Sequence, residues 1–200
     1  GKFRQPNPTC TGGGCLDFPL GASACTMLLE GPRFEYNGRL FNTKDDDDGC
    51  FSTSHAFVDV DGDNDLDLFG GSAHCGCMYW ENVDGDFVRR EGESLNPLFN
   101  CLSNATDETQ SWRGGGGLAF LDADADGDSD AYVATNTGHI LFFNNTGNLT
   151  SPLFVLQPSS TIHTGLGGGD WGIAPAFADL DADGDMDLLV AKGGAGVWIF

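Results

Sequence analysis

The residues best suited to chemistry in this sequence are aspartates at alternate positions of three short segments. Counted from Asp59, Asp122 and Asp179, each segment reads D-x-D-x-D-[GN]-x-x-D, with carboxylates at positions 1, 3, 5 and 9 and a further Asp at position 7. Ca²⁺ is a hard cation that takes about six to eight oxygen ligands, and alternate residues of a tight loop can converge on one point. The pattern predicts about three calcium ions, bound for structure and not for catalysis.

The predicted metal-binding residues lie in three loops, 59–67, 122–130 and 179–187. Position 7 is expected to contribute its backbone carbonyl oxygen. The full set is Asp59, Asp61, Asp63, Asp65 and Asp67; Asp122, Asp124, Asp126, Asp128 and Asp130; and Asp179, Asp181, Asp183, Asp185 and Asp187.

Two alternative interpretations of these loops fail on physical grounds. A solvated acidic face would crowd half of the 30 acidic residues into three short loops, and such crowding repels unless a cation compensates it. An EF-hand needs a glutamate at position 12 and flanking helices, whereas position 12 is Gly70, Val133 or Val190. The sharp turn at position 6 is filled by Gly127, Gly184 and Asn64, residue types that tolerate a positive φ.

The elements around the loops predict an all-β repeat. Segments 56–67, 119–130 and 176–187 align without gaps, and Pro-x-Phe recurs at 32–34, 97–99 and 152–154. Each unit offers four strands: Ala-Phe before the loop, an apolar run after it, an aromatic strand (78–80, 140–143, 197–200) and a Phe-containing strand near Pro-x-Phe. Four short strands per unit favour four-stranded antiparallel β-propeller blades with a calcium-binding hairpin loop in each.

Glycines and turn residues mark the expected connections. The runs 114–117 and 167–169 lack the context of a phosphate-binding loop and are interpreted as tight entries into a blade that use positive φ. Asp84-Gly85 predicts a hairpin turn. The acidic run 45–48 is interpreted as a solvated loop and not as a fourth metal site.

Composition limits the partners and the compartment. With 30 acidic and 9 basic residues the net charge is −21, which argues against nucleic acid and anionic membranes. No apolar run is long enough for a membrane span. Sequons at Asn104, Asn144 and Asn148 and cysteines without zinc-ribbon spacing favour a secreted or cell-surface glycoprotein. The disulfide candidates are Cys10, Cys15, Cys25, Cys50, Cys75, Cys77 and Cys101. A zinc site at His74, Cys75 and Cys77 with Cys50 is the weaker alternative, because neighbouring strand positions point two ways.

The pattern A-F-x-D-x-D-x-D-G-D-x-D-L followed by an aromatic strand resembles the FG-GAP/VCBS repeats of integrin-α-type β-propellers. Residues 139–154 look like the outer half of such repeats in large surface proteins of algae and other protists. The resemblance covers roughly residues 32–200 and implies blades, an extracellular role and calcium ligands at positions 1, 3, 5 and 9 of each loop. Residues 1–31 are expected to be a Cys- and Gly-rich cap or the end of a preceding blade. The last blade is incomplete at Phe200, so a partial or fragment propeller is expected.

Three functions from different classes follow. The leading hypothesis is a structural or adhesive calcium-binding surface protein, without an active site, that forms a homo-oligomer, filament or coat with other copies, surface proteins or glycans. A lectin is the alternative, with Trp80, Trp112, Trp171 or Trp198 stacking on sugars. A polysaccharide lyase or hydrolase is the third, although Glu30, Glu35 and Glu91 lack a supporting context.

Overall fold

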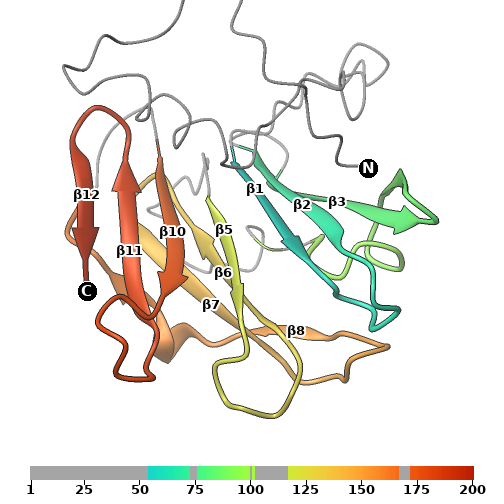
Figure 1. Ribbon diagram of the computed structural model, residues 1–200. Helices are drawn as coiled ribbons and strands as arrows, with labels where there is room; N and C mark the ends of the chain where they lie inside the picture. Colours follow the sequence, from blue (N-terminus) through green and yellow to red (C-terminus); the bar gives the residue numbers. More distant parts are fainter. Residues whose placement is uncertain (1–53, 73–75, 100, 102–116, 167–171) are drawn as a thin grey trace, which may run out of the picture. The chain divides into compact units, whose positions relative to one another are not determined.

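The computed structural model describes residues 54–72, 76–99, 101, 117–166 and 172–200, all within the compact unit Leu40–Phe200. These residues form three antiparallel sheets and contain no α-helix (Figure 1). No helix in the described ranges could cross a membrane. The all-β prediction is confirmed.

We call the three sheets blade 1, blade 2 and blade 3. Blade 1 has the order β1 (Ser54–Val58), β2 (Asp67–Ser72), β3 (Gly76–Val83), β4 (Asp86–Arg90). Blade 2 has the order β5 (Leu118–Leu121), β6 (Asp130–Ala134), β7 (His139–Asn145), β8 (Phe154–Leu156), and β9 (Ile162–His163) also pairs with β7. Blade 3 has the order β10 (Ile173–Ala178), β11 (Asp187–Lys192), β12 (Gly196–Ile199).

The strand pairing recurs with the same register in each repeat that was predicted from the sequence. In each blade the Ala-Phe strand pairs with the strand that follows the Asp loop, as in Phe57 opposite Leu68, Phe120 opposite Ala131 and Phe177 opposite Leu188. Each loop therefore closes a β-hairpin, and position 12 lies within a strand, which excludes the EF-hand. The first three strands predicted for each unit are confirmed.

The fourth strand of blade 1 was predicted wrongly. Residues 97–99 around Pro97 and Phe99 are turns, and Leu98 is buried in the core. The outer strand is instead β4, which follows β3 through the Asp84-Gly85 turn, where both residues have positive φ. The hairpin prediction at this turn is confirmed, and it supplies the strand. In blade 2 the strand β8 begins at Phe154, as predicted.

Aromatic side chains join neighbouring blades. Phe120 of β5 packs on Phe69 of β2 with ring centroids 5.0 Å apart, and Phe177 of β10 packs on Tyr132 of β6 at 4.6 Å. The Phe of the repeated Ala-Phe pair thus fills the interface with the preceding blade. Two buried clusters follow these contacts, one between blades 1 and 2 and one between blades 2 and 3. Each pair of neighbouring blades therefore buries its own hydrophobic cluster, as in stacked repeat units.

The first strands of the three blades lie next to one another. β5 contacts both β1 and β10, and Figure 1 draws the three strands running in the same direction. Gly117 donates a backbone hydrogen bond to Ile173 at 3.0 Å. A side chain at Gly117 would come within 2.4 Å of the Ala174 backbone, so a close approach, and not the predicted positive φ, requires glycine here. The other predicted entry glycines lie outside the described residues.

Candidate metal centres

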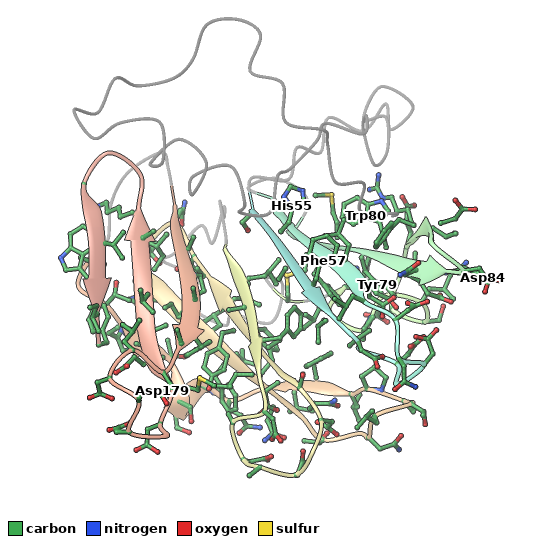
Figure 2. All side chains as sticks on the ribbon, viewed as in Figure 1. His55, Phe57, Tyr79, Trp80, Asp84 and Asp179 are labelled. Atoms are coloured by element: carbon green, nitrogen blue, oxygen red, sulfur yellow. A yellow bond between two sulfur atoms is a disulfide. The ribbon has the colours of Figure 1, made fainter. Side chains whose placement is uncertain are left out.

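Each Asp loop brings three carboxylates together. The ligand atoms of each group lie within 4.8 Å of one another, which is close enough for one cation to contact all three. Figure 2 labels Asp179 beside the loop between β10 and β11. The groups are Asp59, Asp61 and Asp63; Asp122, Asp124 and Asp130; and Asp179, Asp181 and Asp187.

The loop backbones are held by their own aspartates. In the second loop the carboxylate of Asp122, at position 1, accepts hydrogen bonds from the backbone amides of Asp126 and Gly127, at positions 5 and 6, at 3.1 Å each. In the third loop the Asp179 carboxylate accepts the amides of Asp183 and Gly184 in the same way. These bonds fold the chain around the first carboxylate, so the loop geometry follows from the aspartates themselves.

Position 9 anchors the loop to the sheet. Asp130 is 1% exposed and accepts amide hydrogen bonds from Ala123 at 3.0 Å and from Asn145 at 2.7 Å. Asp67 is equally buried and accepts the amides of Val60 and Asn82. In the third loop Asp187 accepts the Leu180 amide. Position 9 therefore holds the loop closed, and in the second and third loops it also belongs to the three-carboxylate group.

The sequence analysis missed part of this anchor. Asn82 and Asn145 each follow the anchoring aspartate by 15 residues, at the end of the third strand. Their side chains also accept amides of the following turn, those of Gly85 and Gly147. The recurrence of Asn at this spacing is the signal that could have identified them.

The predicted ligands that the three groups leave out have other surroundings. Asp126 and Asp183 at position 5 accept the amides of position 7 at 3.1 and 2.9 Å. The side chains of Asp65 and Asp128 at position 7 each have a buried oxygen that receives no hydrogen bond from the described residues. Asp185, also at position 7, is exposed.

Burial and mutual repulsion raise the pKa of several of these carboxyl groups. Burial raises the pKa of Asp67 to about 6, and the nearby Asp61 carboxylate adds to this, while hydrogen bonds from Asn82, Val60 and Tyr79 oppose it. The pKa of Asp130 is raised for the same first reason, with Asp124 and Asp126 adding to it. Ionising all of these carboxyl groups is therefore electrostatically unfavourable, and a bound divalent cation would relieve their repulsion.

We expect acid to stabilise the calcium-free chain and to destabilise the calcium-loaded chain. The pKa of Asp67 is about 6 in the folded chain and 3.8 in its ordinary state. Between these values only the folded chain binds the proton, so this contribution is complete below pH 3.8 and is lost as the pH rises through 6. With calcium bound, the proton competes with the ion and weakens its binding. Urea unfolding midpoints measured at pH 5 and pH 7 give the change in stability with pH, once in chelator and once in excess calcium.

The control for this pH dependence is Asp67→Asn, which removes the titrating group. It should flatten the slope in chelator between pH 5 and 7. A wild-type chain that gains stability with acid in both conditions would show that protons and calcium do not compete here.

Position 4 of each loop carries backbone strain that the sequence did not reveal. Position 6 has positive φ as predicted, at Asn64, Gly127 and Gly184, but so does position 4, which is Gly62 in the first loop and alanine in the others. Ala125 and Ala182 both have φ 61°. A non-glycine residue in this region costs about 1 kcal/mol or more.

We therefore expect Ala125→Gly to stabilise the calcium-loaded chain by about 1 kcal/mol, because glycine adopts this φ without strain. Ala123→Gly is the matched control, since Ala123 is also exposed in the same loop but has no positive φ. It should be neutral or destabilising in urea titrations. Equal effects of the two substitutions on stability would contradict the backbone strain at Ala125.

The cysteine and sequon predictions have mixed outcomes. Cys77 and Cys101 form a disulfide, so Cys77 is not available to the alternative zinc site. The remaining cysteines and Asn104 lie outside the described residues. Asn148 is exposed, whereas the Asn144 side chain donates a hydrogen bond to Asp124 in the second loop at 2.9 Å.

The alternatives for function meet specific obstacles. Trp80 is only 5% exposed and packs with Leu68 and Met78, so its ring face is not offered to a sugar. Trp198 is half-buried, and Trp112 and Trp171 lie outside the described residues. Glu91 pairs with Arg89 at 3.0 Å, and Glu30 and Glu35 are not described.

Comparison with known proteins agrees with the repeat. Residues 109–190 match the family model described as an FG-GAP-like repeat. A search of curated proteins finds no match. The matched segment contains the second and third Asp loops and the strands that flank them, and blade 1 repeats the same hairpin and register. Residues 109–190 therefore form an FG-GAP-like repeat segment of this chain.

Proposed function

We propose that this chain is an extracellular, calcium-binding structural or adhesive glycoprotein, a subunit of a surface filament or coat, and not an enzyme. One observation carries the proposal: a three-carboxylate group recurs at the equivalent hairpin of three successive blades, formed by positions 1, 3 and 5 in the first loop and by positions 1, 3 and 9 in the other two. A single such group would suit many roles. A group in every unit suits an ion that stabilises the repeat itself.

Calcium would act on the rigidity of the blades. Each loop joins the first two strands of a blade. The carboxylate of position 9 accepts a loop amide in the second and third loops, and in blade 2 it also accepts the Asn145 amide at the end of the third strand. An ion shared by positions 1 and 3 and, in the second and third loops, by position 9 would fix the hairpin to the sheet. Rigid blades in series suit a protein that bears load or presents a fixed surface.

The extracellular setting has separate support. FG-GAP-like repeats are typical of extracellular adhesive proteins, as the resemblance implies. The Cys77–Cys101 disulfide is stable only in an oxidising compartment. Extracellular calcium is abundant enough to fill sites of modest affinity. Asn148, exposed on a turn of blade 2, is the sequon best placed to carry a glycan.

Partners of this protein are proposed to be other copies, surface proteins or glycans. The test is a bead assay with the secreted, glycosylated chain. Beads coated with it should aggregate with one another, or adhere to beads coated with surface extract, in millimolar calcium and not in chelator. Beads coated with the Asp130→Ala variant should aggregate less.

The outcomes separate the functions. Capture by a glycan array that competes with aggregation would assign the lectin. Release of reducing ends from a polysaccharide panel would assign the enzyme. Folded, calcium-loaded chain that neither aggregates nor adheres would overturn the adhesive role.

A further inference from the structure

A small cavity lies between the first and second Asp loops. Its volume is about 50 Å³, enough for one cation with a water molecule. Both blades contribute to its wall, so whatever occupies it contacts both. The lining residues are Asp59, Val60, Gly127, Asp128, Ser129, Asn145 and Leu149.

The Asp128 carboxylate is the unusual group in this wall. Asp128 is only 9% exposed, and its Oδ1 atom is buried and receives no hydrogen bond from the described residues. Leaving a buried carboxylate oxygen without a donor or a cation is costly. The third loop offers a direct comparison, because Asp185 occupies the same position 7 and is exposed.

The part of the chain that the structure describes supplies no lysine or arginine to the cavity. Among the described residues the basic side chains are Arg89, Arg90 and Lys192, and none of them lines it. Arg89 and Arg90 pair with glutamates, and Lys192 donates to the Leu166 carbonyl at 2.7 Å. The Asn145 side-chain oxygen already accepts two backbone amides. The cavity therefore suits a cation that binds from solution.

The cavity walls are held in place by close packing. Gly62 of the first loop lies so near the turn of blade 2 that a side chain there would come within 2.9 Å of the Leu149 carbonyl oxygen. Asp59 accepts the amides of Gly62 and Asn64 at 2.8 and 3.0 Å, which fixes its side of the wall. Asp128 and Asp59 thus approach the cavity from opposite blades on rigid supports.

We propose that a fourth Ca²⁺ binds in this cavity, held by the Asp128 carboxylate and by oxygen atoms of the first loop, and that it clamps blade 1 to blade 2. Calcium suits the site because the wall offers oxygen ligands only and in an irregular arrangement, which Mg²⁺ tolerates poorly. The two loops carry ten carboxylates, more than two loop-bound calcium ions neutralise. This inference rests on the proposed calcium chemistry of the loops and adds a site between them.

The test is calcium stoichiometry by equilibrium dialysis of the secreted chain, with metal analysis. The wild type should bind four ions. Asp128→Asn should bind three, because it removes the cavity ligand and leaves the position 7 backbone carbonyl of the second loop intact. Asp185→Asn, the same change at the same position of the exposed third loop, should bind four.

The outcomes distinguish this site from the loop sites. Three ions in both the wild type and Asp128→Asn would overturn the bridging ion and leave the loop sites standing, with water in the cavity. A loss from three ions to two in Asp128→Asn would assign its side chain to the second loop and also overturn the bridge. No bound calcium at all would overturn both proposals. An anomalous difference map from calcium-grown crystals gives a second readout, with a fourth peak beside Asp128 expected and its absence decisive against the site.

Discussion

Chelating calcium should lower the melting temperature of this chain by on the order of 20 °C. Each ion that binds only the folded form stabilises it by about 2.7 kcal/mol at one hundred times its Kd. Three loop ions together approach about 8 kcal/mol, a large part of the stability of an ordinary domain. A change of about 1 kcal/mol corresponds to roughly 2–4 °C for a domain of this size.

The measurement is differential scanning calorimetry with disulfides intact, in excess calcium and in excess chelator. Magnesium serves as the control ion, because the loops offer irregular oxygen sites and magnesium demands near-octahedral geometry. It should restore little of the lost stability. A melting temperature that is the same in calcium and in chelator would show that calcium does not stabilise the folded chain through the Asp loops.

Asp130→Ala should be the most damaging single substitution among the loop aspartates, with a loss of about 3–5 kcal/mol in saturating calcium. The change removes a carboxylate from the group with Asp122 and Asp124. It also leaves the amides of Ala123 and Asn145 without their acceptor at a position that is 1% exposed. Each unsatisfied buried donor costs about 1–3 kcal/mol.

Asp126→Ala is the matched comparison in the same loop. Asp126 is exposed, lies outside the three-carboxylate group and accepts one part-buried amide, so its loss should cost about 1 kcal/mol. Asp130→Asn should fall between the two, because one oxygen acceptor remains. Urea unfolding in saturating calcium measures all three. An Asp126→Ala effect as large as that of Asp130→Ala would contradict the anchoring role of position 9.

The repeat and its hairpin loops could be predicted because they depend on local residue patterns. The Ala-Phe strand, the Asp loop and the apolar strand are contiguous, and their spacing determines which residues pair across the hairpin. The turn at position 6 could be predicted for the same reason. Asn64, Gly127 and Gly184 are residue types that tolerate its positive φ.

The features that escaped prediction depend on contacts between distant residues. The outer strand of blade 1 is β4 and not the segment around Pro97, because the tight Asp84-Gly85 turn brings β4 back onto β3 at once. Strand β9 reaches β7 from across a loop, and no local pattern marks it. The positive φ of Ala125 contradicts the preference of alanine and is imposed by the closure of the loop.

The candidate ligands were predicted as a set, but their division of labour was not. The spacing predicted side-chain ligands at positions 1, 3, 5 and 9 and a backbone carbonyl ligand at position 7. The hydrogen bonds instead attach position 9 to the sheet, and in the second and third loops position 9 also belongs to the three-carboxylate group. Asp128 lines a cavity that residues of the first loop also line. These differences arise from packing between loop and blade, which a single sequence does not encode in a local pattern.

Anomalous diffraction from crystals grown in calcium will show whether each Asp loop encloses a calcium ion. We expect one peak within each three-carboxylate group, including one bounded by Asp122, Asp124 and Asp130. Loops that contain only water in well-resolved maps, with calcium at millimolar concentration in the crystal, would contradict this expectation.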